Sequence, residues 1–114
     1  MATNSSVFQG KWHIYEMEMW DEDYFNMALQ AYIEIKANNL GYFQFGLVEG
    51  QTDGKVVAHP DGARFEFSWD GYDENDPANG CGWLKLKNPD AVEGEIRLHL
   101  GDDSTFLAQR AKSI

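Results

Sequence analysis

Acidic side chains crowd one stretch of this sequence, where their oxygens could bind a hard metal ion. Asp70, Asp73, Glu74 and Asp76 lie within residues 69–80. Ca²⁺ takes about six to eight oxygen ligands, and this segment could supply several of them. An EF-hand loop also needs a glycine at its sixth position, which no start at an aspartate provides here. We therefore interpret the segment as a solvated acidic loop and predict no metal site.

A second pair of carboxylates could perform acid–base chemistry. Glu16 and Glu18 would share a face with Trp12 if residues 10–20 form a strand, and burial in an apolar barrel would suit them to act as general acids. Burial of an unpaired charge costs on the order of several kcal/mol, however. We therefore expect the strand to twist or bulge near Glu16 and to turn both side chains outward. If both point inward, an arginine should pair with one of them.

The remaining nucleophiles and metal ligands form no recognisable motif. His13, His59 and His99 lack the spacing of a zinc-ligand pair. Cys81 lies between two glycines and among acidic residues, which do not activate a thiol. No serine lies in a nucleophile elbow, and no glycine-rich phosphate loop occurs. We expect no cofactor and assign no catalytic residue.

The net charge of the chain limits the kinds of molecule that we expect it to bind. Its 114 residues include 19 acidic and 9 basic side chains, which give a formal net charge of −10. Nucleic-acid backbones and anionic membrane surfaces repel such a field, so we expect neither as a partner. A cationic ligand or a basic protein fits the charge, although an acidic surface also serves solubility.

Cysteine content and the first residues suggest a location. Cys81 is the single cysteine, so the chain forms no internal disulfide. Residues 1–6 have neither the basic nor the apolar region of a signal peptide, and no apolar run reaches the ~20 residues of a membrane-spanning helix. We expect a cytoplasmic protein.

Turn signals recur along the chain, at residues 50–54 among others, and divide it into short β-favouring runs. Alternation of apolar and polar residues, as around Phe65 and Phe67, is typical of antiparallel strands with one buried face. We predict disorder over residues 1–7 and a single β-barrel domain over 8–114. The predicted strands are 10–20, 31–37, 41–49, 54–59, 63–70, 81–87, 93–100 and 104–111.

A short helix is expected between the first two strands, over about residues 21–29. Asp21 can cap it, and the acidic residues that follow suit the positive end of the helix dipole. Trp20 and Phe25 have the spacing of a hydrophobic staple. Such a helix would form a lid over one end of the barrel.

The first segment also fits a different fold. Phe8, Trp12, Tyr15 and Met19 have helical spacing, so residues 8–29 could form one long helix wrapped by a curved sheet. The β-favouring run that begins at Trp12 favours a strand instead. The all-β barrel of about eight antiparallel up-and-down strands is our main prediction, and the long helix is the alternative.

The two ends of the chain resemble a known class of barrels. The run Gly10-Lys11-Trp12 is similar to the Gly-x-Trp signature that begins strand one of the calycins, the lipocalins and fatty-acid-binding proteins. The resemblance implies that Trp12 stacks beneath a basic residue of the last strand, where Arg110 is in place; a guanidinium over an indole is a favoured cation–π contact. The internal carboxylate clamp of the fatty-acid-binding proteins has no match here.

The chain as a whole resembles a group of short, uncharacterised bacterial proteins. The stretches that carry this resemblance include Trp20–Tyr24, Phe67–Gly71 and Gly101–Ser104. The resemblance implies a bacterial, cytoplasmic origin and says nothing about chemistry.

A homodimer would use the other face of the first strand. His13, Tyr15, Met17 and Met19 lie on that face and could form an exposed apolar patch with neighbouring tyrosines. Packing of the lid helix over this face explains the pattern equally well.

We expect a non-enzymatic binding or protein-interaction module. Eight strands enclose an interior that side chains can fill, so a small-molecule ligand is compatible with the fold but not indicated. The alternative is a small hydrolase or isomerase that uses carboxylates at the lid end. The acidic clusters at 21–23, 70–76 and 102–103 would share that end.

The candidate binding residues are Glu16, Glu18, Trp20, Asp70, Asp73, Glu74, Asp102 and Asp103. The expected core residues are Trp12, Ile14, Ile33, Ile35, Phe43, Phe45, Leu47, Phe65, Phe67, Trp69, Leu84, Leu86, Ile96, Leu98, Phe106 and Ala108.

Overall fold

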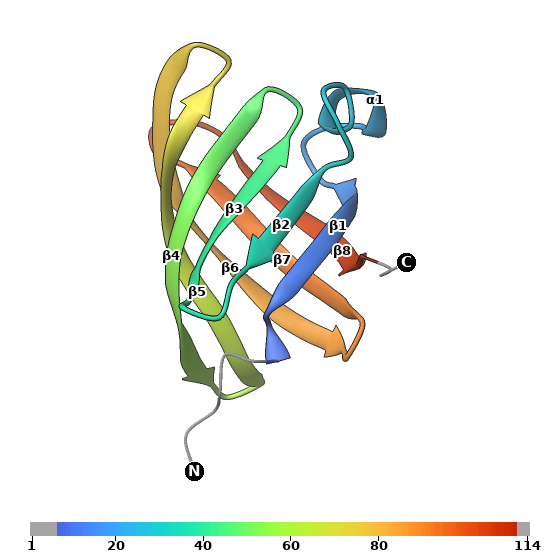
Figure 1. Cartoon of the computed structure of the whole chain (residues 1–114), viewed down its shortest axis with the longest axis vertical. Helices are drawn as coiled ribbons and strands as arrows, with labels where there is room; N and C mark the ends of the chain where they lie inside the picture. The colour runs from blue at the N-terminus through green and yellow to red at the C-terminus, as the bar shows by residue number, and fades with distance from the viewer. Residues whose placement is uncertain (1–6, 112–114) are drawn as a thin grey trace.

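Eight antiparallel strands close into a barrel in the order in which they follow one another along the chain (Figure 1). The computed structural model describes residues 7–111. The first strand pairs with both the second and the last, which closes the sheet. The prediction of a small up-and-down barrel with one short helix after strand one is confirmed. The elements are β1 (Gly10–Met17), α1 (Glu22–Phe25), β2 (Tyr32–Ile35), β3 (Leu40–Phe45), β4 (Val48–His59), β5 (Gly62–Asp73), β6 (Asp76–Asn88), β7 (Ala91–Leu98) and β8 (Asp103–Arg110).

The connections between strands alternate between two ends of the barrel. The end that carries α1 is called the upper end, as it stands in Figure 1. The upper connections are residues 18–31, 46–47, 74–75 and 99–102. The lower connections are residues 36–39, 60–61 and 89–90.

The first segment is a strand and not part of a long helix. Residues Gly10 to His13 pair with β2, and residues Trp12 to Met17 pair with β8. The alternative fold, with a helix over residues 8–29, is therefore wrong. The alternation of a buried Trp12 with a half-exposed His13 follows the two faces of a strand.

One predicted turn is the middle of a strand. The glycines of residues 50–54 indicate a turn, but β4 runs through them without a break. Gly50 and Gly54 face the interior, where a Cβ would lie 2.8 Å from the Phe43 ring and 2.7 Å from the Phe65 ring, respectively. The turn lies earlier, at residues 46–47. An inward glycine that makes room for an aromatic ring gives the same sequence signal as a turn glycine.

The acidic segment is a β-hairpin rather than a loop. β5 continues to Asp73 and β6 begins at Asp76, which leaves only Glu74 and Asn75 in the turn. The predicted loop over residues 69–80 is therefore wrong in extent. Its glycines, Gly71 and Gly80, again lie within strands. At both positions the backbone of a neighbouring strand lies too close for a side chain to fit.

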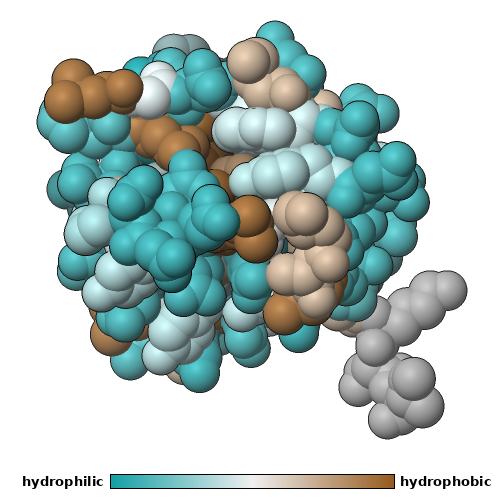
Figure 2. Space-filling view, turned by 90° about the horizontal axis from the view of Figure 1, so that it is seen from above, coloured by the Kyte–Doolittle hydropathy of each residue, from teal (hydrophilic) through white to brown (hydrophobic). Residues whose placement is uncertain are grey.

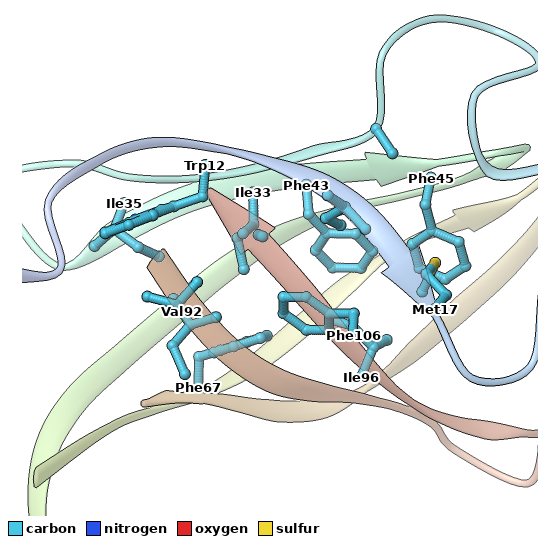
Figure 3. Packing of buried hydrophobic residues seen from close by; sticks show 14 of the residues in the cluster. Trp12, Met17, Ile33, Ile35, Phe43, Phe45, Phe67, Val92, Ile96 and Phe106 are labelled. Carbon is cyan, nitrogen blue, oxygen red and sulfur yellow. The ribbon is translucent and has the colours of Figure 1, made fainter. Parts of the chain in front are cut away.

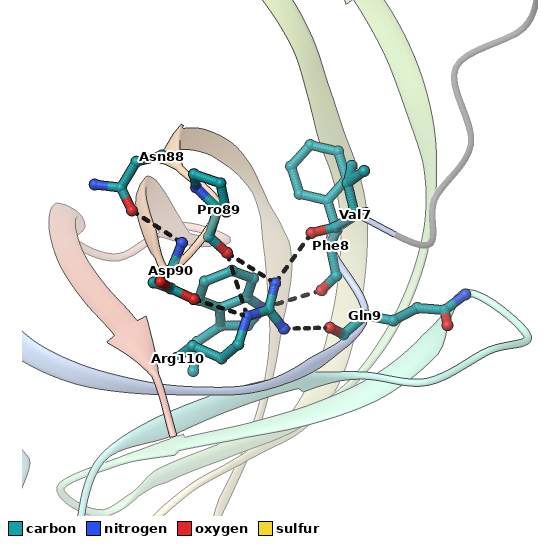
Figure 4. A network of polar contacts seen from close by, with 8 residues as sticks. Val7, Phe8, Gln9, Asn88, Pro89, Asp90 and Arg110 are labelled. Atoms are coloured by element: carbon teal, nitrogen blue, oxygen red, sulfur yellow. Dashed lines mark hydrogen bonds and ion pairs between the residues drawn. The ribbon is translucent and has the colours of Figure 1, made fainter. Parts of the chain in front are cut away.

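A stacked pair, Trp12 and Arg110, joins the two ends of the chain, as the Gly-x-Trp resemblance implies, and Figure 4 shows the polar contacts around Arg110. The Arg110 guanidinium lies 4.1 Å from the centre of the Trp12 ring. The same guanidinium donates hydrogen bonds to the carbonyl oxygens of Gln9 (2.8 Å) and Pro89 (3.1 Å). Gly10 has a φ of 118°, and a Cβ there would lie 2.8 Å from the Arg110 Nη1. Arg110 therefore ties the last strand to the start of the first and to the β6–β7 turn.

Aromatic and aliphatic side chains from all around the barrel fill its interior (Figure 3). Small residues alternate with large ones: a Cβ on Gly94 would lie 2.6 Å from the Phe106 ring. The predicted core is largely present, with corrections at its ends. Leu47 is 38% exposed because it lies in the β3–β4 turn, and Leu86 and Leu98 are half-buried.

Candidate functional site

The upper end brings together the acidic clusters that the sequence singles out. Residues 21–23 belong to the β1–β2 connection, residues 73–76 of the predicted 70–76 cluster surround the β5–β6 turn, and residues 102–103 lie where the β7–β8 connection meets β8. The up-and-down topology places all three at the same end of the barrel. This end is therefore the candidate site.

The helix α1 is a single turn that its caps fix in place. The Asp21 carboxylate accepts a hydrogen bond from the backbone N–H of Tyr24 (3.1 Å), as predicted for an N-cap. The helix ends at Phe25 and not near residue 29, because the Asn26 side chain accepts the N–H of Ala31 (2.8 Å) and directs the chain toward β2. Phe25 is buried in the core cluster beneath the helix.

Hydrogen bonds join α1 to the β3–β4 turn, and that turn to the β5–β6 turn. The Gly46 N–H donates to the Phe25 carbonyl (2.8 Å), and the Leu47 N–H donates to the Tyr24 hydroxyl (3.4 Å). The Glu74 N–H donates to the Leu47 carbonyl (2.8 Å). A Cβ on Gly46 would lie 2.3 Å from the Tyr24 ring, so glycine is needed for this approach. Three upper connections therefore form one continuous, fixed surface.

Trp20 lies half-buried where this surface meets the core. Its ring centre is 5.0 Å from that of Phe45 and 6.0 Å from that of Tyr24. The neighbouring Met19 N–H donates to the hydroxyl of the buried Ser104 (3.1 Å), which fixes this segment to β8. The predicted binding residue Trp20 is thus held in a defined position at the upper end.

Apolar side chains are exposed at the upper end. Among residues 7–111, five of the six exposed Met and Leu side chains belong to the upper connections. Figure 2, which looks down on this end, shows hydrophobic atoms running across the middle of the surface between hydrophilic groups. We call these five residues the apolar strip. They are Met19, Met27, Leu29, Leu47 and Leu100.

Leu100 combines full exposure with a backbone conformation that leucine rarely adopts. Its side chain is 96% exposed and its φ is 61°. The Gly101 N–H donates to the Leu98 carbonyl (2.9 Å), so Leu100 occupies the third position of a four-residue turn. Positive φ at that position favours Gly or Asn, and it costs a residue with a side chain about 1–2 kcal/mol. Nothing in the fold of this chain requires leucine there.

Carboxylates share the upper end with the apolar strip, and within residues 7–111 they form no ion pair. The upper connections contain no Lys or Arg. None of the five ion pairs within the described residues includes a carboxylate of the three clusters or Glu18. We call these nine residues the upper acids. They are Glu18, Asp21, Glu22, Asp23, Asp73, Glu74, Asp76, Asp102 and Asp103.

The nearest arginine is occupied by another carboxylate. Arg97, one residue before the end of β7, donates to Glu95 (3.2 Å). This hydrogen bond, the Glu95 charge and the nearby Asp103 raise the pKa of the Arg97 guanidinium. The upper end therefore keeps a strongly negative surface.

A bulge in β1 turns both glutamates outward, as predicted. The register between β1 and β8 shifts next to Glu16, where Tyr15 is the extra residue. Met17 is buried as a result, while Glu16 and Glu18 stay exposed. Both line a groove of about 450 Å³ on the outer face of β1, β7 and β8, together with Glu93.

The same bulge divides the apolar patch predicted on the other face of β1. Met17 was expected outside but packs in the core, and only Tyr15 and Met19 of the apolar set stay exposed. Tyr32 follows on β2 with the Lys11 ammonium 4.5 Å from its ring centre. Burial, and then the neighbouring carboxylates, raise the pKa of Tyr32. A homodimer through this face stays a prediction.

Asp70 lies apart from the other candidate residues. Its side chain is exposed on β5, where it lines a groove of about 610 Å³ over β2 to β6 with residues such as Tyr42 and Gln51. The candidate residues thus occupy three places: the β1 groove, the upper end and this outer groove. The upper end holds Glu18, Trp20, Asp73, Glu74, Asp102 and Asp103.

Neither a metal centre nor a spanning helix is found in the part of the chain that the structure describes. No three His, Cys, Asp or Glu side chains within it are placed to hold a metal ion. Its helix is too short to cross a membrane. The sequence prediction missed the apolar strip. Leu29 was expected on the apolar side of a longer helix with Phe25, and Leu100 was expected at the end of the strand 93–100, whereas both lie exposed in upper connections.

No protein-family model, curated protein or solved structure matches the chain. The closed barrel fits the calycin architecture loosely, and membership of that family is not shown. Function must therefore be argued from the geometry of the upper end.

Proposed function

We propose that this chain is a non-enzymatic protein-interaction module, in which a filled barrel presents the apolar strip and the upper acids to a protein partner. The main support is the exposure of five Met and Leu side chains at one end of a hydrogen-bonded surface. Apolar patches rimmed by polar residues are typical of protein contact sites. Methionine side chains adapt readily to a partner's shape.

Because side chains fill the interior, a binding site on the surface is favoured rather than a ligand inside the barrel. Eight-stranded barrels such as lipocalins hold a small molecule where their interior is left open. Here Trp12, Phe43 and Phe67 occupy the interior together with Phe25, which is buried beneath α1. A calycin-like carrier function is therefore not part of the proposal.

The carboxylate-enzyme alternative requires several acids in one cavity. Glu16 and Glu18 line the β1 groove, whereas Asp70 lines the outer groove over β2 to β6. The β1 groove therefore holds two of these three acids, but both side chains are exposed to solvent and do not lie in the apolar site that would suit them to act in an enzyme. We do not propose one.

Charge and cysteine chemistry support the expected setting. A net charge of −10 favours a basic protein over nucleic acid or an anionic membrane. The exposed Cys81 suits a reducing cytoplasm, in which we propose that the protein acts.

Comparative capture from a lysate of the source organism tests the proposal. Wild-type protein, Leu47→Ser/Leu100→Ser and a matched lower-end variant, Leu40→Ser, are immobilised in equal amounts after circular dichroism confirms their fold. Leu40 is 45% exposed, so its change controls for lost surface apolarity. We expect partners on the wild type and on Leu40→Ser that are lost from the upper-end variant. The same set on all three proteins would contradict the proposal.

A further inference from the structure

We infer that the partner segment is a cationic amphipathic helix, whose apolar side lies along the apolar strip and whose basic residues face the upper acids. This inference rests on the proposed function and names the partner's chemistry. The charges, the shape of the upper end and the conformation of Leu100 carry it.

The carboxylates at the two ends of the barrel differ in whether they form ion pairs within the described residues. At the lower end, Asp61 pairs with Lys85 (2.7 Å) and lies 3.5 Å from Arg64, and Asp90 lies 3.9 Å from Arg110. Among the residues that the structure describes, the upper acids form no such pairs. A cationic segment that binds the upper end therefore gains contacts that the chain itself does not supply, and the field of the unpaired acids accelerates its approach.

The shape of the upper surface suits a helix. Its hydrophobic atoms form a band with hydrophilic groups on both sides (Figure 2). An amphipathic helix presents a stripe of apolar residues at positions i, i+3, i+4 and i+7, with polar residues beside the stripe. Lysines and arginines beside such a stripe would face the upper acids, which lie in or next to the same connections as the apolar strip.

Leu100 points to an apolar anchor. It is held in an unfavourable conformation at the tip of the β7–β8 connection, where asparagine or glycine would be more stable. Strained, exposed residues of this kind are concentrated at binding sites. A partner that buries Leu100 would give this exposed side chain apolar contacts.

A second copy of the chain fits this end poorly. A symmetric dimer places the same surface on both sides of the contact. The upper acids of two copies would then face one another and repel, because neither copy carries Lys or Arg in its upper connections.

Model peptides test the inference. The probe is a fluorescein-labelled Leu–Lys peptide of about 18 residues, or five helical turns, with all leucines on one face. A Leu–Glu peptide with the same pattern and a Leu–Lys peptide with scrambled order are the controls. Fluorescence anisotropy at physiological salt should show saturable binding of the first peptide and at least about tenfold weaker binding of both controls. Affinity should fall as salt rises.

Variants locate the bound peptide on the protein. Leu100→Asn, which suits the backbone, should weaken binding about tenfold, since a buried leucine contributes this much or more. Asp73→Asn/Asp102→Asn should weaken it about fivefold. The matched pair Glu34→Gln/Asp53→Asn removes the same charge away from the upper end and should change affinity less than about twofold.

Tight binding of the Leu–Glu peptide would overturn the inference, as would an equal loss of affinity in the upper and matched charge variants. Absence of Leu–Lys binding to the wild type would also overturn it. The capture experiment reports separately on the proposed function. Partners lost from Leu47→Ser/Leu100→Ser would keep the upper end as a contact site even if the cationic helix is wrong.

Discussion

Removal of the Arg110 guanidinium should destabilise the barrel far more than removal of an ordinary surface charge. Arg110 stacks on the fully buried Trp12 and donates to backbone carbonyls of two separate segments, the chain start and the β6–β7 turn (Figure 4). Its side chain is only about one third exposed. The substitution Arg110→Met keeps the aliphatic stem and removes these contacts.

The expected loss can be worked from the contacts. The cation–π contact contributes about 0.5–2 kcal/mol. Each hydrogen bond from a charged donor contributes about 1.5 kcal/mol at the low end of its range, which suits partial exposure. With two such hydrogen bonds and the cation–π contact, Arg110→Met should therefore lower the free energy of unfolding by about 3.5–5 kcal/mol. Arg110→Lys keeps the charge without the planar fork and should lose about half of this.

Urea denaturation followed by far-ultraviolet circular dichroism measures the effect. Lys87→Met is the control, because Lys87 is exposed and belongs to none of the ion pairs within the described residues. Its change should stay within about 0.5 kcal/mol. If Arg110→Met and Lys87→Met lose the same stability, the closing role of Arg110 is refuted.

Three further predictions concern other parts of the barrel. Leu100→Asn should raise the free energy of unfolding by about 0.5–1 kcal/mol in the same assay, because asparagine tolerates positive φ; a lower value would contradict the strain argument. Gly94→Ala should cost about 1–3 kcal/mol, since its Cβ would meet the Phe106 ring at 2.6 Å; unchanged stability would show that the core has spare room. The hydrogen bond from Lys85 lowers the pKa of Asp61, so this pair stabilises the fold above the usual pKa of aspartate and less as pH falls through the lowered value. Lys85→Met should therefore raise the Asp61 pKa in a carbon-detected NMR titration, and an unchanged value would refute this cause.

The closure of the barrel could be predicted because few residues specify it. Gly10, Trp12 and Arg110 lie at the two ends of the chain, and an indole with a guanidinium above it leaves little freedom in how β1 meets β8. The outward direction of Glu16 could also be predicted, from the cost of burying an unpaired carboxylate.

Strand boundaries could not be predicted at glycines, because a glycine can either permit a turn or make room for a ring inside a strand. Gly46 permits a tight turn, while Gly50 makes room for the rings of Phe43 and Trp69 inside a strand. A single sequence does not separate these uses, since both positions lie between apolar runs. Part of the apolar strip was hidden for a related reason: Leu29 has helical spacing with Phe25, and the Asn26 cap ends the helix before Leu29.

Amide chemical-shift mapping of the labelled protein, titrated with the Leu–Lys peptide, tests the upper end most directly. The perturbed amides should cluster in residues 18–31, 46–47, 73–76 and 98–103. Residues 36–40, 60–61 and 89–90 at the lower end should stay unchanged. Perturbations centred on the outer groove around Tyr42 and Asp70, or on the lower end, would contradict the assignment of the upper end as the contact surface.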